Sequence, residues 1–276
     1  MAKAAEKLPA TTTSVAVVER GSDLPDYLRD DIATYSGAGT SSASKDNILP
    51  WLVVLQKNSP QVNKKDPNYV TGAEAGMVLN RATNKVYDAE NEGILVIPAA
   101  FSKAIMEWEP RVGGAGGKPP VAMHPETTSL LKQARLNEKQ TLVLPNGNEL
   151  LETAFEIVIL VDEQEPAVIS MAKSALQASR RWMSLKRSFK VGNPPVVAPS
   201  FMRMYRLKTT WVQNDKGDWY NWQAEDAGWV NDSYLYSAAK QLHIAFDNGE
   251  VQLGRMEDAE AGGATTGSYP DDGIPI

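Results

Sequence analysis

Nine basic residues fall within one stretch of an otherwise acidic chain. The protein has 276 residues and a formal net charge of −6 at pH 7, yet residues 166–214 contain no Asp or Glu. The basic residues of this stretch are Lys173, Arg180, Arg181, Lys186, Arg187, Lys190, Arg203, Arg206 and Lys208. Cations concentrated inside an acidic protein indicate a polyanionic ligand. A solvated basic face that binds nothing is the alternative.

Aromatic residues share this region. Five of the seven tryptophans lie within residues 182–229, namely Trp182, Trp211, Trp219, Trp222 and Trp229. At least half of them are expected in the core, and the others on a two-sided hairpin are expected to face solvent. Exposed rings beside cations suit an unpaired polynucleotide, because each base stacks for about 1–3 kcal/mol and the cations neutralise the phosphates. We therefore expect the nine cations to contact DNA together with Tyr205, Trp211, Trp219, Tyr220 and Trp222.

Little in the sequence supports catalysis or metal binding. The chain has no cysteine and only two histidines, His124 and His243, which disfavours thiolate chemistry and a multi-histidine metal site. A glycine-rich segment ending at Lys118 lacks the leading glycine and the following Ser or Thr of a phosphate-binding loop. Carboxylate pairs such as Glu225 and Asp226 are expected to be solvated surface. We expect a protein that is not an enzyme and uses no cofactor or metal.

The end of the sequence combines acidic and apolar residues. Residues 247–276 carry seven Asp and Glu residues against one Arg, and residues 259–268 have the composition of a linker. The last six residues include Asp271, Asp272, Ile274, Pro275 and Ile276. An apolar tip beside carboxylates fits a small apolar pocket rimmed by Lys or Arg. These five residues are therefore predicted to bind a partner protein.

The elements that must position the basic and aromatic residues form one predicted domain, residues 47–250. A flexible segment, residues 1–46, precedes it and an acidic tail, residues 251–276, follows it; both are expected to be disordered. Apolar spacings of three and four residues predict a helix over residues 172–190, with Lys173, Arg180 and Arg187 opposite the apolar stripe. A second helix is predicted over residues 232–246.

Strands are expected to build the rest of the domain. A long run over residues 93–108, interrupted at Pro98, suits a bent or an edge strand. Hairpins are predicted over residues 141–161, around Asn146-Gly147, and over residues 201–222. The predicted fold class is α+β, with a small antiparallel barrel or curved sheet, inserted hairpins and two helices. Neither a membrane-spanning run nor a secretory signal is visible, so a cytoplasmic protein is expected.

Two parts of the sequence resemble known proteins. The last residues are similar to the acidic tip of bacterial single-stranded-DNA-binding proteins: Asp271, Asp272, Ile274 and Pro275 match, whereas Gly273 replaces an acid and Ile276 stands in the place of Phe. The body resembles phage-encoded single-stranded-DNA-binding proteins with an OB-type barrel, at residues 52–60, 96–108, 174–182 and 205–222. The resemblance implies an OB-like fold and action on phage DNA in the cytoplasm of an infected bacterium.

These observations favour a single-stranded-DNA-binding protein of phage replication or recombination, whose tip recruits replication or recombination proteins. A strand-annealing recombination protein that forms rings or filaments is the second hypothesis, and homo-oligomerisation stays open. A phage structural or assembly protein is the third, and a nuclease the most distant.

Overall fold

The computed structural model describes residues 49–110, 120–138, 140–215, 217–251 and 253. The chain divides into two compact units, residues 1–43 and 44–276, and every described residue belongs to the second. The predicted flexible segment, residues 1–46, and nearly all of the predicted acidic tail lie outside the described residues.

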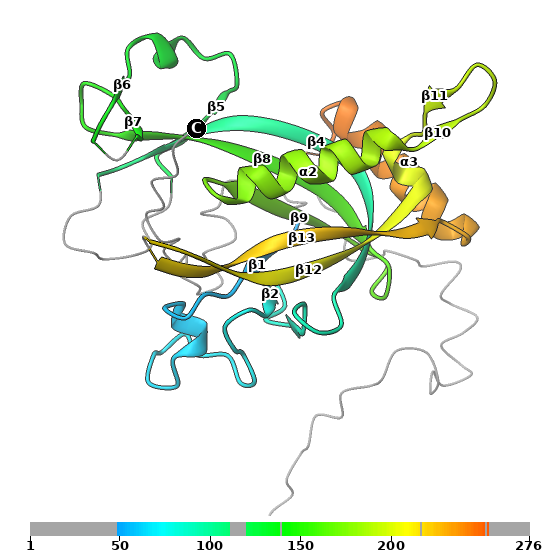
Figure 1. The fold of residues 1–276 in the computed structure, drawn as a ribbon, viewed down its shortest axis with the longest axis horizontal. Coiled ribbons are helices and arrows are strands. Elements are labelled where there is room, and N and C mark those ends of the chain that lie inside the picture. The colour runs from blue at the N-terminus through cyan, green and yellow to red at the C-terminus, as the bar shows by residue number, and fades with distance from the viewer. Residues whose placement is uncertain (1–48, 111–119, 139, 216, 252, 254–276) are drawn as a thin grey trace, which may run out of the picture. The chain divides into compact units, whose positions relative to one another are not determined.

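One large, strongly curved sheet forms the frame of this unit (Figure 1). Its main path runs β13-β12-β4-β8-β9-β1-β2-β3, with β5 beside β4 and the pair β6–β7 beside β8. The long strands are β4 (Ile94–Trp108), β8 (Glu149–Leu160), β9 (Glu165–Ala172), β12 (Arg203–Asn214) and β13 (Gly217–Trp229). The short strands are β1 (Trp51–Val54), β2 (Val78–Asn80), β3 (Val86–Tyr87), β5 (Ala122–Pro125), β6 (Arg135–Leu136) and β7 (Leu142–Val143). Among the described residues, the strand pairs of this sheet are antiparallel except β1 with β9.

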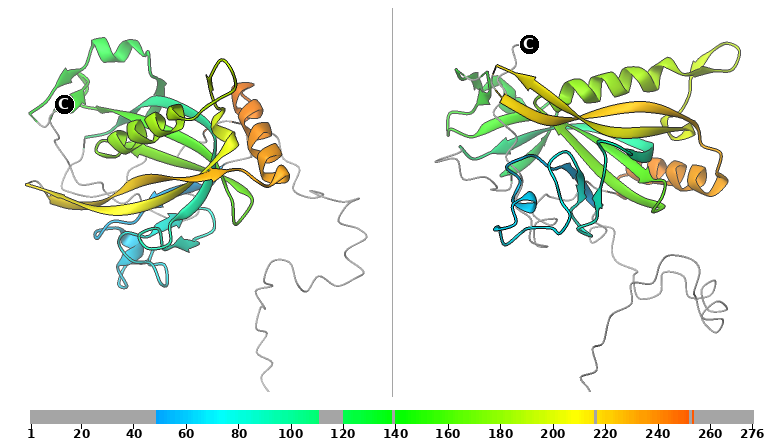
Figure 2. Two further views of the ribbon diagram at one scale, coloured as in Figure 1. Left: turned by 45° about the vertical axis from the view of Figure 1, so that its right-hand side comes forward. Right: turned by 60° about the horizontal axis from the view of Figure 1, so that its bottom comes forward.

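Two α-helices cover opposite faces of the sheet (Figure 2). Helix α2 (Ala175–Ser188) packs on one face, where its Trp182 is 1% exposed and meets the ring of Tyr205 edge-on at 5.8 Å between centroids. Helix α3 (Ser233–Asp247) packs on the other face, where Leu242 and Phe246 contact the cluster around Phe155. Because both faces are covered, β4 and β8 are apolar on successive residues rather than on alternate ones.

Local sequence features explain the bends and ends of these elements. Strand β4 continues through Pro98 but shifts register against β8 between Pro98 and Ala100, a bulge that bends the strand as predicted. Gly147 turns the hairpin between β7 and β8 with φ of 90°. Asp232 caps α3 by accepting hydrogen bonds from two amide groups of its first turn.

Side-chain contacts join the β12–β13 ribbon to the segments that follow β1 and precede β2. The Gln56 side-chain amide donates to the carbonyl of Tyr220 at 2.9 Å and accepts from its N–H at 2.8 Å. Lys57 forms an ion pair with Asp218 at 2.6 Å, and the Thr209 hydroxyl donates a 2.5 Å hydrogen bond to the Gly76 carbonyl. The sheet therefore curls back on itself, although β13 and β3 remain its two ends.

The coarse prediction of an α+β fold is confirmed: a curved, mostly antiparallel sheet carries two α-helices in the described part of the chain. The predicted helices at 172–190 and 232–246 correspond to α2 and α3. The predicted hairpins correspond to β7–β8 and β12–β13. A small hairpin that was not predicted, β10 (Lys190–Val191) with β11 (Val196–Val197), follows α2 and projects from the unit (Figure 1).

Candidate nucleic-acid interface

Four of the nine predicted cations form an exposed group on and just after α2. Arg180, Arg181 and Arg187 are exposed on the helix, and Lys190 is exposed at the start of β10. None of the four forms an ion pair with another described residue. We call this group the α2 cationic face.

The sequence of α2 explains why these charges point outward. Ala175, Trp182 and Lys186 are buried on one side of the helix, and the arginines follow the opposite side at the 3.6-residue period. From Arg180 to Arg187 the helical part of this face extends about 10 Å, at 1.5 Å per helical residue. No acidic residue occurs in residues 166–214, so no neighbour along the chain neutralises it.

Lys186 belongs to the predicted set but lies in the core. It is 7% exposed, and its Nζ donates to both carboxylate oxygens of Glu156 on β8, at 2.8 and 2.7 Å. Burial raises the pKa of the Glu156 carboxyl above its ordinary value, and Lys186 opposes that shift. The prediction that Lys186 faces DNA is therefore replaced by a role in attaching α2 to the sheet.

Arg203 is also buried, inside a stack of rings. Its guanidinium donates to Asp226 on β13 through two hydrogen bonds, of 2.9 and 2.5 Å. The guanidinium carbon lies 3.7 Å from the ring centroid of Phe189 and 4.4 Å from the ring centroid of Trp229. Arg203 therefore connects the end of α2 to both strands of the ribbon and is not available to a phosphate.

The remaining predicted cations already have partners or lie off the helix. Lys208 lies 3.5 Å from a carboxylate oxygen of Glu225, and Arg206 donates to the backbone carbonyl of Glu92 at 2.9 Å. Lys173 immediately precedes α2 in a left-handed conformation, with φ of 51°. Acids from other strands thus neutralise part of the basic region that the sequence predicted to be open.

Most of the predicted stacking rings are buried. Tyr205, Trp219 and Trp222 are at most 5% exposed, so they are core residues and cannot stack on a base in this structure. Burial raises the pKa of Tyr205 to about 12, as expected for a phenol taken out of water. The expectation that some rings belong to the core is confirmed for these three and for Trp182.

Trp211 and Tyr220 lie together nearer the tip of the ribbon. Trp211 is 38% exposed, its ring meets Tyr220 edge-on at 5.0 Å, and the Lys57 ammonium lies 4.1 Å from its ring centroid. Tyr220 is half-buried, against the backbone of Gly76. This pair keeps one of the predicted rings accessible, beside a cation that the sequence had not indicated.

The sequence analysis did not predict that Trp229 is exposed. At 44% exposed it is the most accessible tryptophan of the described residues, although it had been grouped with the ring cluster and not with the expected contacts. Its position at the end of β13, opposite Arg203, is set by the register of the ribbon. Only the strand pairing, which sequence periodicity does not reveal, brings it to the end of α2.

Comparison with known proteins places the chain in a phage family. Residues 18–252 match the family model described as Pam3 phage gp34-like protein. The chain belongs to this family. No curated protein and no solved structure matched it.

Membership in the Pam3 phage gp34-like family agrees with the phage origin that the resemblance implied, and the family's description states no activity.

Outside the α2 cationic face, Glu107 accepts from Asn148 at 2.6 Å and lies 2.7 Å from Nε2 of His124. These contacts lower the pKa of the Glu107 carboxyl, with the Asn148 hydrogen bond contributing most. They join β4, β5 and the β7–β8 turn.

Two further features of this family member concern metals and membranes. In the described ranges, no three His, Asp or Glu side chains are grouped so that they could hold a metal ion. Over the same ranges, neither α-helix is long and apolar enough to cross a membrane. The predicted partner-binding residues Asp271, Asp272, Ile274, Pro275 and Ile276 lie outside the described residues.

Proposed function

We propose that this phage protein binds single-stranded DNA through the α2 cationic face and acts in phage DNA replication or recombination in the bacterial cytoplasm. The supporting observation is the α2 cationic face itself, where three arginines on a helix and one lysine just after it have no described ionic partner, in a protein of net charge −6. Phosphates are the counter-charge that such a group can bind, because a helix face about 10 Å long, continued by Lys190, spans more than one of them.

Unpaired DNA fits this surface better than a duplex. Trp211 and Trp229 are partly exposed in the same unit, and exposed rings bind unstacked bases, which a duplex does not present. The curved sheet, brought back on itself at Gln56, also supports an OB-like interpretation, in which a curved sheet carries the strand. We keep the OB-like comparison as part of this proposal.

The salt dependence of binding tests the proposal. Each phosphate neutralised on a single strand contributes about −0.7 to the slope of log affinity against log salt, so four cations predict a slope near −3. Titrating the full-length protein with labelled oligo-dT at several salt concentrations measures the slope, and a duplex of equal length is the comparison. Absence of binding to oligo-dT, or a slope near zero, would remove the proposal.

The acidic tip is proposed to recruit replication or recombination proteins. The support is its sequence alone: Asp271 and Asp272 adjoin an apolar end, as in the bacterial tips that it resembles. Deleting residues 271–276 should leave oligo-dT affinity equal or tighter, because the tip has the charge of DNA. The same deletion should abolish capture of replication or recombination proteins from infected cells. Weaker DNA binding by the shortened chain, or undiminished capture, would contradict this division of roles.

A further inference from the structure

In the stack formed by Phe189, Arg203 and Trp229, the indole ring of Trp229 is partly exposed to solvent. One face of the Trp229 indole lies against the Arg203 guanidinium, whose central carbon is 4.4 Å from the ring centroid. The side chain is nevertheless 44% exposed. Since the guanidinium lies over one face of the indole, a planar ligand can stack only on the opposite face.

This ring is held in place before any ligand arrives. Two hydrogen bonds to Asp226 fix the plane of the Arg203 guanidinium, and its central carbon also lies 3.7 Å from the ring centroid of Phe189. Arginine in such a planar, doubly bonded setting loses little further freedom when another group stacks on it. A ligand that stacks on Trp229 therefore meets a preorganised surface and pays little to order it.

The location connects the ring to the proposed phosphate contacts. Phe189 is the residue directly between the end of α2 and Lys190, so the supported ring adjoins the C-terminal part of the α2 cationic face. Positively charged groups beside a rigid, exposed indole are the combination that binds one nucleotide by its phosphate and its base together.

We propose that Trp229 is a stacking platform for an unpaired nucleobase, which would form the next layer on the Phe189–Arg203–Trp229 stack. This inference rests on the proposed function, and it assigns the base contact to a residue that the sequence did not single out. The ligand class is a planar heteroaromatic base carried on a phosphodiester chain. The platform reads the flat face of the base, so it should accept all four bases.

Two oligomers separate the base contact from the phosphate contacts. Full-length protein is titrated with oligo-dT and with an abasic oligomer of the same length, which has the phosphates but no bases. Trp229→Leu, which keeps an apolar side chain but removes the ring, should bind oligo-dT about tenfold more weakly and the abasic oligomer as tightly as the wild type. Trp229→Phe, which keeps a ring, should lose at most about threefold on oligo-dT.

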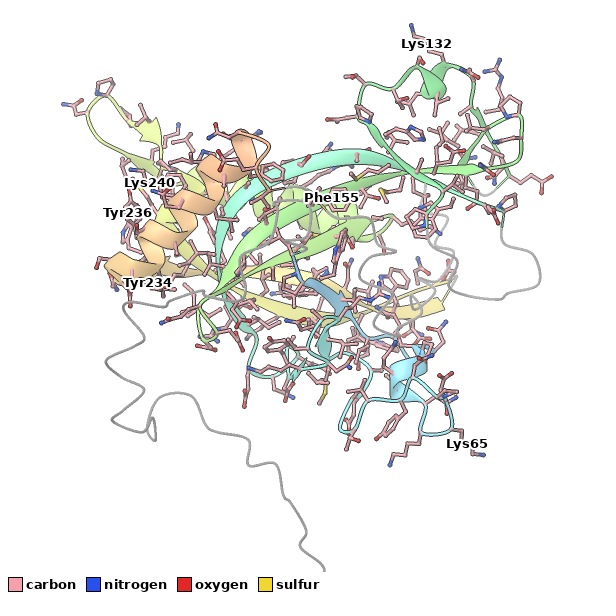
Figure 3. The ribbon with its side chains drawn as sticks, turned by 180° about the vertical axis from the view of Figure 1, so that it is seen from behind. Lys65, Lys132, Phe155, Tyr234, Tyr236 and Lys240 are labelled. Carbon is pink, nitrogen blue, oxygen red and sulfur yellow. The ribbon has the colours of Figure 1, made fainter. Side chains whose placement is uncertain are left out.

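A matched control and a second measurement guard against a folding defect. Tyr234 is 62% exposed in the first turn of α3, outside the elements that carry the cationic face, so Tyr234→Leu should leave both affinities unchanged (Figure 3). Oligo-dT should quench the tryptophan fluorescence of the wild type more than that of Trp229→Phe, which has the ring but no indole at this position.

The outcomes distinguish the two proposals. If the wild type binds neither oligomer, the proposed function fails. If it binds oligo-dT, but Trp229→Leu binds equally well or Trp229→Phe is quenched like the wild type, the platform alone is overturned. Equal losses of Trp229→Leu on both oligomers would also overturn it, because the residue would then act without a base.

Discussion

Replacing Arg180, Arg181 and Arg187 by Gln is expected to remove most of the protein's affinity for single-stranded DNA. All three side chains are exposed and without a described ionic partner, so the change costs no internal contact, and Gln is a good helix former. Loss of three phosphate contacts should reduce the salt slope from near −3 to about −1 and weaken binding at 0.15 M salt by on the order of 50-fold. Fluorescence anisotropy with labelled oligo-dT measures both quantities.

The control for this triple variant removes the same number of positive charges at other positions on the surface. Lys65, Lys132 and Lys240 are exposed and lie on three separated parts of the unit, a loop, the arm beyond β5 and helix α3 (Figure 3). Their replacement by Gln lowers the net charge equally but should change the affinity by less than about threefold. If both triple variants weaken binding alike, overall charge governs binding and the α2 cationic face has no special part in it.

Removing Lys186 is expected to cause the largest loss of stability. Lys186→Met leaves the carboxylate of Glu156, which is 0% exposed, without the ammonium group that donates to both of its oxygens. Breaking one side of a buried ion pair typically costs about 3–5 kcal/mol. Urea unfolding, followed by tryptophan fluorescence, measures the loss. Glu156→Leu combined with Lys186→Met removes both charges and should recover most of it.

The pH dependence of the Lys186→Met variant has a definite sign. The pKa of Glu156 is raised in the folded protein, so the folded state holds the proton more strongly than the unfolded chain. The contribution of this group to stability is therefore complete below the ordinary pKa of Glu and decreases as the pH rises through the folded-state pKa. Without Lys186 the pKa rises further, so the variant should lose more stability than the wild type as the pH rises above the ordinary pKa of Glu. An equal loss over this range would contradict this account of the ion pair.

The sequence predicted local elements better than it predicted contacts between them. Helix α2 followed from the spacing of its apolar residues, and the bend of β4 from Pro98, because both depend on near neighbours in the chain. The partners of the basic residues did not follow, because Glu156 comes from β8 and Asp226 from β13. An acid-free stretch of sequence is thus not an acid-free surface, since neighbouring strands bring in their own carboxylates.

The aromatic residues illustrate a second limit. Alternation along a hairpin suggests one buried and one exposed face, but α2 packs against β13 and the ribbon also meets the loops around Gln56 and Gly76. Trp219 and Trp222, on opposite sides of the strand, are therefore both buried. The short β10–β11 hairpin was missed because two-residue strands leave too little periodicity to detect.

The contacts of Arg203 have a consequence for the spacing of the contacts that a bound DNA strand would make. The guanidinium of Arg203, at the start of β12, lies against Phe189, the residue after α2, and against Trp229 at the end of β13, and it donates to Asp226 on the same strand. The distance between the charged helix and the open indole is therefore set by a single side chain and not by a loop. A polynucleotide that binds at both places would therefore have a fixed distance between the phosphate on α2 and the base on Trp229. This distance would be the same in every copy of the protein.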